Sequence, residues 1–117
     1  MKKLTKSDVR NLLISNKNAL VYVSPLIRDE NKAAELLKKI QSKIDGGLQI
    51  ECTRRSYASN TSSLAFIDEK TNEISYLYMN SWTSAMEYKG FIILINKIKA
   101  TATKRPQIKF MVYKVRE

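Results

Sequence analysis

Residues 91–115 read FIILINKIKATATKRPQIKFMVYKV, and this stretch predicts a long β-hairpin. Strands are expected over 91–99 and 107–115, because both segments are rich in branched and aromatic side chains. The connection, 100–106, consists of small and basic residues, and Pro106 stiffens the start of the returning strand. The hairpin is therefore the part of the sequence that says most about the fold.

The remaining segments mix helices and strands without regular alternation. Helices are predicted over 7–16, 33–44 and, as a short element, 81–89. Thr5 and Asp8 indicate a capping-box-like start of the first helix. Asp29 or Asn31 can cap the start of the second, and Gly46-Gly47 is expected to end it. Further strands are predicted over 19–24, 48–53, 64–67 and 74–79. The order is therefore α-β-α-β-β-β-α-β-β.

This order predicts the α+β class, with residues 1–117 forming a single basic domain. We expect two to three helices on one face of a largely antiparallel, mixed sheet of about six strands. The strand over 19–24 has one alternative, which is to pair in parallel with the next strand through the intervening helix.

The composition excludes several kinds of catalysis. The chain has 117 residues, no His and one Cys. Without His, it has neither a Ser-His nor a Cys-His nucleophile pair. Cys52, the lone cysteine, can form no internal disulfide and no cysteine-rich zinc site.

The net charge of +10 is unevenly distributed along the chain. Residues 89–117 carry eight basic side chains and one acidic side chain, whereas residues 58–88 carry one basic and four acidic side chains. Residues 1–27 carry five basic side chains and one acidic side chain. The two ends of the chain are thus basic, and the segment before the C-terminal hairpin is acidic.

The C-terminal hairpin combines this charge with a shape that suits nucleic acid. Its two strands become basic and polar toward their shared tip, as in the β-ribbon arms that enter DNA grooves. Small residues at the tip allow close approach, and the cations pair with phosphates. The residues predicted to do so are Lys97, Lys99, Lys104, Arg105 and Lys109. The alternative is that these cations only protect an exposed hairpin edge against aggregation.

Two other basic groups are predicted to assist. The first is the amino-terminal segment, from which we select Lys3, Lys6 and Arg10. The second is the pair Arg54 and Arg55, of which only one easily reaches a given partner because neighbouring strand residues point to opposite faces. A solvated basic tail is the alternative interpretation of the first group.

Aromatic residues suggest base stacking on a single strand as a further alternative. The residues concerned are Tyr57, Tyr76, Tyr78, Trp82 and Tyr88. We expect most of them to pack in the core instead, because aromatic residues that alternate along strands usually build the buried face of a sheet.

One enzymatic alternative has to be weighed. The order of a helix, three strands, a helix and a strand is also the core order of restriction-endonuclease-like nucleases, which hold a divalent metal with acidic residues and a lysine. Asp68, Glu69 and Lys70 resemble their acid-x-Lys element, with Glu51 as an upstream acid. The triplet falls at a predicted turn, however, and the next strand has no such pair. We predict no catalytic residues, no metal and no cofactor, and an inactive domain with that topology stays an alternative.

The sequence therefore predicts a non-enzymatic nucleic-acid-binding protein that contacts mainly the phosphate backbone of DNA or RNA. The alternative is a small protein-binding module of phage or virus type, such as an inhibitor that docks on an acidic surface of a host protein. A homodimer is compatible with either function. Because polar residues follow Met1–Leu4 where a signal peptide needs an apolar run, we expect a cytoplasmic protein with no membrane partner, in the host cytoplasm if a virus encodes it.

Overall fold

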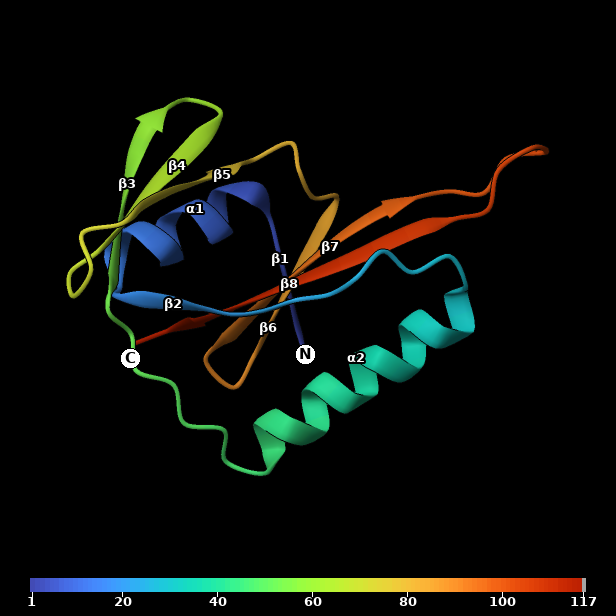
Figure 1. The fold of residues 1–117 in the computed structure, drawn as a ribbon, viewed down its shortest axis with the longest axis horizontal. Coiled ribbons are helices and arrows are strands. Elements are labelled where there is room, and N and C mark those ends of the chain that lie inside the picture. Colours follow the sequence, from blue (N-terminus) through green and yellow to red (C-terminus); the bar gives the residue numbers. More distant parts are fainter. Residues whose placement is uncertain (117) are drawn as a thin grey trace.

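The structure is a computed structural model that describes residues 1–116, and these form two helices and eight strands (Figure 1). The helices are α1 (Lys6–Ser15) and α2 (Glu30–Asp45). The strands are β1 (Lys2–Leu4), β2 (Asn18–Val23), β3 (Arg54–Asn60), β4 (Ser63–Asp68), β5 (Ile74–Tyr78), β6 (Ser84–Tyr88), β7 (Phe91–Ile98) and β8 (Gln107–Val115). Neither of these two helices is long and apolar enough to cross a membrane.

All eight strands belong to one sheet, in the order β1-β6-β7-β8-β2-β3-β4-β5. Every neighbouring pair is antiparallel, so the α+β class is confirmed and the parallel alternative for β2 is wrong. β2 joins β3 at a single pair, Asn18 with Arg54, and β3, β4 and β5 then diverge from the other strands (Figure 1).

The two helices lie on opposite faces of this sheet, which corrects the prediction that helices cover one face. Along β7, Ile92 and Leu94 pack in the same cluster as α1, whereas Phe91 and Ile93 pack in the cluster of α2. Successive strand residues point to opposite faces, so a strand covered on both sides needs an unbroken apolar run. Residues 91–95 of β7 form such an unbroken apolar run.

Both helix starts predicted from the sequence are confirmed. Thr5 and Asp8 form a capping box at α1, in which each side chain bonds the backbone N–H of the other. Asp29 caps α2 by accepting from the backbone of Asn31 at 2.8 Å and of Lys32 at 3.2 Å. Because α2 ends at Asp45, just before the glycine pair, its C-terminal stop is also where the sequence predicts it.

The predicted strand over 48–53 is wrong. This segment has no regular structure, and the strand that follows α2 begins only at Arg54. The apolar residues of the alternating pattern pack from a loop instead. Ile50 packs against the α2 cluster, and Cys52 lies half-buried beside the Lys114 carbonyl. The pattern records which side chains are buried, but the backbone does not pair with a neighbour.

The predicted short helix over 81–89 is also wrong, because this segment contains strand β6. The β6–β7 connection is a two-residue turn in which Lys89 has φ 50° and Gly90 has φ 82°. Positive φ at both central residues is the geometry of a tight hairpin turn, to which glycine is well suited. Gly90 therefore closes a hairpin and does not end a helix. With β1 and β3 also present, the strands number eight in the described residues and not about six.

Replacement of a β7 residue tests the two-faced core. Ile93 is fully buried between the sheet and α2, whereas Ile98, on the same strand, is 54% exposed. We expect Ile93→Ala to lower the free energy of unfolding by about 2–5 kcal/mol, because a cavity replaces buried methylene groups. Urea denaturation measures this loss. The matched control Ile98→Ala should change it by less than about 0.5 kcal/mol, and equal losses for the two variants would contradict this packing.

Candidate nucleic-acid interface

The far end of the β7–β8 hairpin projects beyond the rest of the sheet (Figure 1). We call residues 96–109 the arm. Strand pairing continues along it as far as Ile98 with Gln107, one pair beyond Ile108, which still packs in the core. At its tip, the Thr101 N–H donates to the Lys104 carbonyl at 3.0 Å, and the Thr101 hydroxyl oxygen accepts from the Lys104 N–H at 3.1 Å. The tip is therefore a hydrogen-bonded turn of small side chains.

The arm carries all five cations that the sequence assigned to it, and each is exposed. Lys97 forms an ion pair with Glu30 at the start of α2, with 3.0 Å between Nζ and the carboxylate oxygen. Within residues 1–116, no carboxylate forms an ion pair with the other four, which are Lys99, Lys104, Arg105 and Lys109. These four charges are thus solvated and open to a partner.

The cations lie on both faces of the arm. Lys97 is paired in register with Ile108, which packs toward α2. Lys109 is paired with Asn96 and therefore points to the opposite face. A ribbon that carries positive charge on both sides meets two rows of phosphates at once when it enters a groove.

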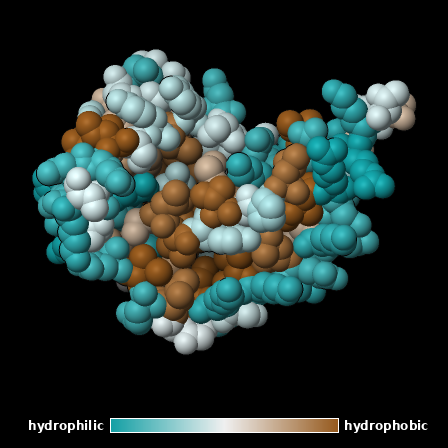
Figure 2. Space-filling model, in the orientation of Figure 1, coloured by the Kyte–Doolittle hydropathy of each residue, from teal (hydrophilic) through white to brown (hydrophobic). Residues whose placement is uncertain are grey.

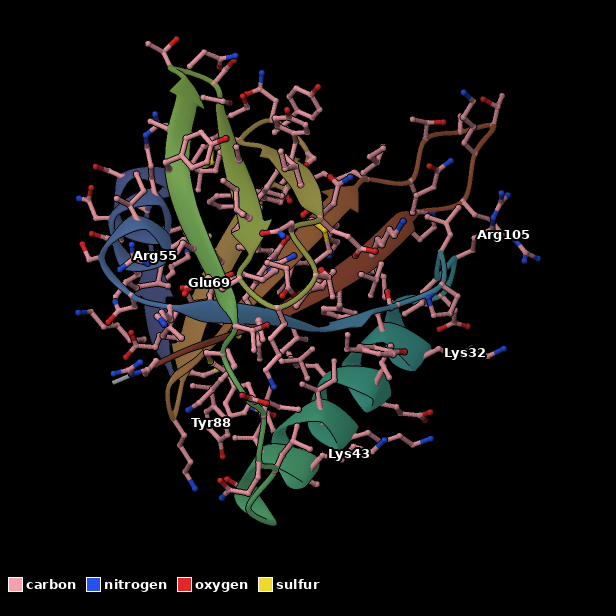
Figure 3. All side chains as sticks on the ribbon, turned by 60° about the vertical axis from the view of Figure 1, so that its left-hand side comes forward. Lys32, Lys43, Arg55, Glu69, Tyr88 and Arg105 are labelled. Carbon is pink, nitrogen blue, oxygen red and sulfur yellow. The ribbon has the colours of Figure 1, made fainter. Side chains whose placement is uncertain are left out.

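Two further cations beside the arm were not predicted. A cleft of about 700 Å³ separates the arm from the start of α2, and its lining includes Arg28, Lys32 and Arg105 together with Asp29. Figure 3 shows Lys32 and Arg105 on the same side of the molecule, one on the helix and the other on the arm. A basic residue at a helix start has no distinguishing sequence signal, because only the tertiary fold brings it beside the arm.

The amino-terminal cations do not form a second patch. Lys6 donates its ammonium protons to the backbone carbonyls of Met79 and Trp82, and Nζ lies 4.7 Å from the centre of the Trp82 ring. Arg10 donates to the Asn60 carbonyl at 2.8 Å. Both side chains hold α1 to the β3–β5 part of the sheet. Lys3 is exposed on the edge strand β1, which β6 separates from β7 and so from the arm.

The arginine pair on β3 points to opposite faces, as the alternation predicts. The Arg54 guanidinium is half-buried, lies 4.3 Å from the centre of the Phe66 ring and donates to the Asn18 side-chain oxygen at 3.3 Å. Burial lowers the pKa of Arg54, and the nearby Tyr113 partly opposes this shift. Arg55 is exposed and its Nε lies 3.3 Å from a carboxylate oxygen of Glu69. Figure 3 labels both residues. Neither arginine belongs to the arm.

The acidic segment that resembles a nuclease element is a turn. The Asp68 carboxylate accepts from the backbone N–H groups of Lys70 at 2.9 Å and Thr71 at 3.3 Å, and these hydrogen bonds lower its pKa. Lys70 pairs with Glu51 at 2.8 Å. In the described part of the chain, no three His, Cys, Asp or Glu side chains gather in a way that would hold a metal ion.

The structure therefore gathers the predicted arm residues and disperses the others. Lys97, Lys99, Lys104, Arg105 and Lys109 share one projecting element, whereas Lys6, Arg10 and Arg54 have structural contacts elsewhere. No protein-family model, curated protein sequence or solved structure matches this chain.

The contacts of Lys6 predict a structural role. We expect Lys6→Ala to lower the free energy of unfolding by about 1–3 kcal/mol, because two carbonyls lose a charged donor. Chemical denaturation measures this effect. The control Lys3→Ala removes the same charge from an exposed site and should be neutral within about 0.5 kcal/mol. If both variants are neutral, the two carbonyl contacts do not stabilise the fold.

Proposed function

We propose that this protein binds nucleic acid through the arm, without catalysis. The observation that carries this proposal is the projection of the arm from the sheet with four exposed cations, Lys99, Lys104, Arg105 and Lys109, which form no ion pair within residues 1–116. Cations held on an extended ribbon reach phosphates that a flat surface does not reach.

The chemistry of the contact follows from these residues. Lysine and arginine side chains displace the counterions condensed on the nucleic acid, so that binding weakens steeply as salt increases. The Thr101 turn at the tip is small enough to approach the sugar-phosphate backbone closely. Arg28 and Lys32, across the cleft from Arg105, extend the basic surface to the start of α2. Contacts of this kind position a ligand and read little of its sequence.

A second candidate function is supported by apolar side chains beside the arm. Leu20, Val23 and Leu26 are 42–47% exposed. Figure 2 shows apolar residues gathered over β2 and the segment that precedes α2, bordered by hydrophilic residues of the arm and of α2. An apolar patch with a basic border suits the alternative partner, an acidic surface of another protein, such as the host target of a viral inhibitor.

Fluorescence anisotropy tests the proposed function. Labelled duplex DNA, single-stranded DNA and duplex RNA are titrated with the protein at two salt concentrations. We expect affinity to fall with salt, and the double variant Lys104→Ala, Arg105→Ala to weaken binding. The slope of log affinity against log salt should decrease by about two, because each lost phosphate contact removes about one unit.

The control is Lys38→Ala, Lys39→Ala, which removes the same charge from exposed positions on α2. A general effect of net charge would weaken binding equally in both double variants, whereas an arm interface predicts a larger loss for the arm variant. Absence of binding to all three ligands at low salt would refute the proposal. Retention of a protein from nuclease-treated extract would then support the acidic protein partner.

A further inference from the structure

The two edges of the sheet differ in how they are protected. One edge strand, β1, has three residues, of which Lys2 and Lys3 are both exposed lysines. A short strand and lysine side chains are common means of keeping a sheet edge from pairing with another chain. The other edge strand, β5, has five residues, ISYLY, with neither a charged side chain nor a proline. β5 is therefore the edge at which a further strand is able to pair.

The hydrogen bonds beside β5 fix which of its backbone groups are free. Just before β5, the Asp68 N–H donates to the Glu73 carbonyl at 3.0 Å. Alternate residues of an antiparallel strand bond the same neighbour, so the odd-numbered residues of β5 bond β4. The even-numbered residues point their backbone N–H and C=O groups away from β4, and these residues are Ile74, Tyr76 and Tyr78. Within residues 1–116, the Tyr78 carbonyl alone of these groups has a partner, which is Ser81.

The free edge of β5 borders a cleft of about 420 Å³. Residues 75–78 line one side of this cleft, and the root of the β7–β8 hairpin lines the other side with Asn96, Lys109 and Met111. Asn96 and Lys109 are paired in register, and Met111 packs against the cluster of α1. The cleft therefore lies between the free edge of β5 and the hairpin, where an added strand has to run.

The side chains of β5 divide between its two faces. Leu77 packs in the cluster of α1, and Ser75 shares its face because successive strand residues point to opposite sides. Tyr76 and Tyr78 lie on the other face and are 59% and 62% exposed. The core packing that the sequence led us to expect for these two tyrosines is therefore wrong. Their rings point to the face away from Leu77, and their backbone groups form the free edge.

The cleft is positively charged. Lys109 is exposed on the hairpin side. Beside β5, Nη1 of the half-buried Arg54 lies 3.4 Å from the hydroxyl oxygen of Ser75. No residue that lines this cleft is acidic, within the part of the chain described. The adjoining cleft differs, because its lining includes Glu51, Asp68 and Glu73. The cleft at the edge of β5 thus favours a ligand with acidic side chains.

We propose that β5 pairs with an extended acidic segment of a partner protein, which adds a further strand to the sheet. The backbone of the segment bonds the free N–H and C=O groups of β5. Its side chains alternate between the two faces, so acidic residues on the cleft side meet Lys109 and Arg54. Apolar residues on the other side pack beside the rings of Tyr76 and Tyr78. This site is independent of the function proposed for the arm.

A second copy of this chain and a nucleic-acid strand fit the edge less well. The β5 strand of a second copy has no acidic side chain, and pairing of two such strands places the cations of two clefts near each other. Like charges across an interface repel. A nucleic-acid strand supplies phosphates, but it has no regular row of amide N–H and C=O groups to bond a strand edge. An acidic peptide meets both requirements.

Fluorescence anisotropy with labelled peptides tests this inference. The probe is a short peptide in which glutamate and valine alternate, and a second probe carries lysine in place of glutamate. We expect only the acidic peptide to bind. The variant Tyr76→Pro removes an outward N–H at the centre of β5 and no hydrogen bond to β4, so it keeps the sheet intact. It should bind the acidic peptide about tenfold more weakly, because a carbonyl of the peptide loses its donor.

The matched control is Tyr76→Ala, which keeps the N–H and removes only the ring. It should weaken binding by less than about fivefold, because one cross-strand side-chain contact is lost. Equal losses for Tyr76→Pro and Tyr76→Ala would show that the ring and not the backbone binds the peptide, and would contradict strand addition.

Two modified probes give the answer even if Tyr76→Pro does not fold. One probe is N-methylated at its valines and the other at its glutamates, so each lacks the N–H groups along one edge. An antiparallel added strand places the residues opposite Tyr76 on the tyrosine face, and the valines then bond β5. N-methylation of the valines should therefore abolish binding, whereas N-methylation of the glutamates should preserve it. Equal affinities of the two modified probes would refute strand addition.

Other occupants of the edge give distinct outcomes. Absence of binding by the acidic peptide refutes the site. Sedimentation that shows a dimer of the wild-type protein but a monomer of Tyr76→Pro assigns the edge to a second copy and also refutes it. Oligonucleotide binding that Tyr76→Pro weakens assigns the edge to nucleic acid, with the same consequence. Because the arm does not include β5, failure of the peptide to bind leaves oligonucleotide binding intact, and the two proposals fail separately.

Discussion

Burial of β7 on both faces is the constraint on which the other elements depend. From Phe91 to Leu94 each side chain is at most 3% exposed, and successive residues belong alternately to the clusters of α2 and α1. A strand in this position requires a helix on each side, and it places β6 and β8 as its neighbours. The rest of the sheet is added outward from these three strands.

The same constraint explains why the hairpin becomes an arm. The unbroken apolar run of β7 ends at Ile95, and the residues that follow, Asn96, Lys97 and Ile98, pack in neither core cluster. The strand pairing nevertheless continues to Ile98. The other side of β8 is also held at its root, because Ile27 and Ile108 exchange backbone hydrogen bonds of 2.8 Å in both directions. The arm is thus an extension of the central ladder beyond the core, braced where it leaves the sheet.

The sequence predicts an element correctly where its start, its end and its buried face are all marked by residues within the element or next to it. Helix α2 has an apolar stripe, a capping aspartate and a terminal glycine pair, and the structure has it as predicted. The predicted helix over 81–89 is wrong because a glycine such as Gly90 suits both a helix end and a tight turn. Only the pairing of Tyr88 with Phe91 distinguishes the turn from the helix end. The predicted strand over 48–53 is wrong because the alternation of apolar and polar residues reflects which side chains are buried, and not whether the backbone pairs with another strand.

In the candidate interface, too, the residues whose grouping is visible in the sequence differ from those whose contacts depend on the tertiary fold. The arm cations were predictable because they are close in sequence and lie on one hairpin. Lys6 and Arg10 were not, since their contacts are with carbonyls of Met79 and Asn60 and so exist only in the folded chain. The exposure of Tyr76 and Tyr78 depends on which face of β5 packs in the core, and that face carries Leu77. A tertiary arrangement of this kind has no local sequence signal.

Nuclear magnetic resonance of the isotope-labelled protein, titrated with a single-stranded oligonucleotide at low salt, tests the central claim most directly. If the arm is the interface, backbone amide signals of residues 96–109 shift first and saturate together. Signals from α1 and from the exposed face of α2 should then remain in place. Shifts centred on α1 or spread evenly over all basic side chains, with the arm unchanged, would contradict the account.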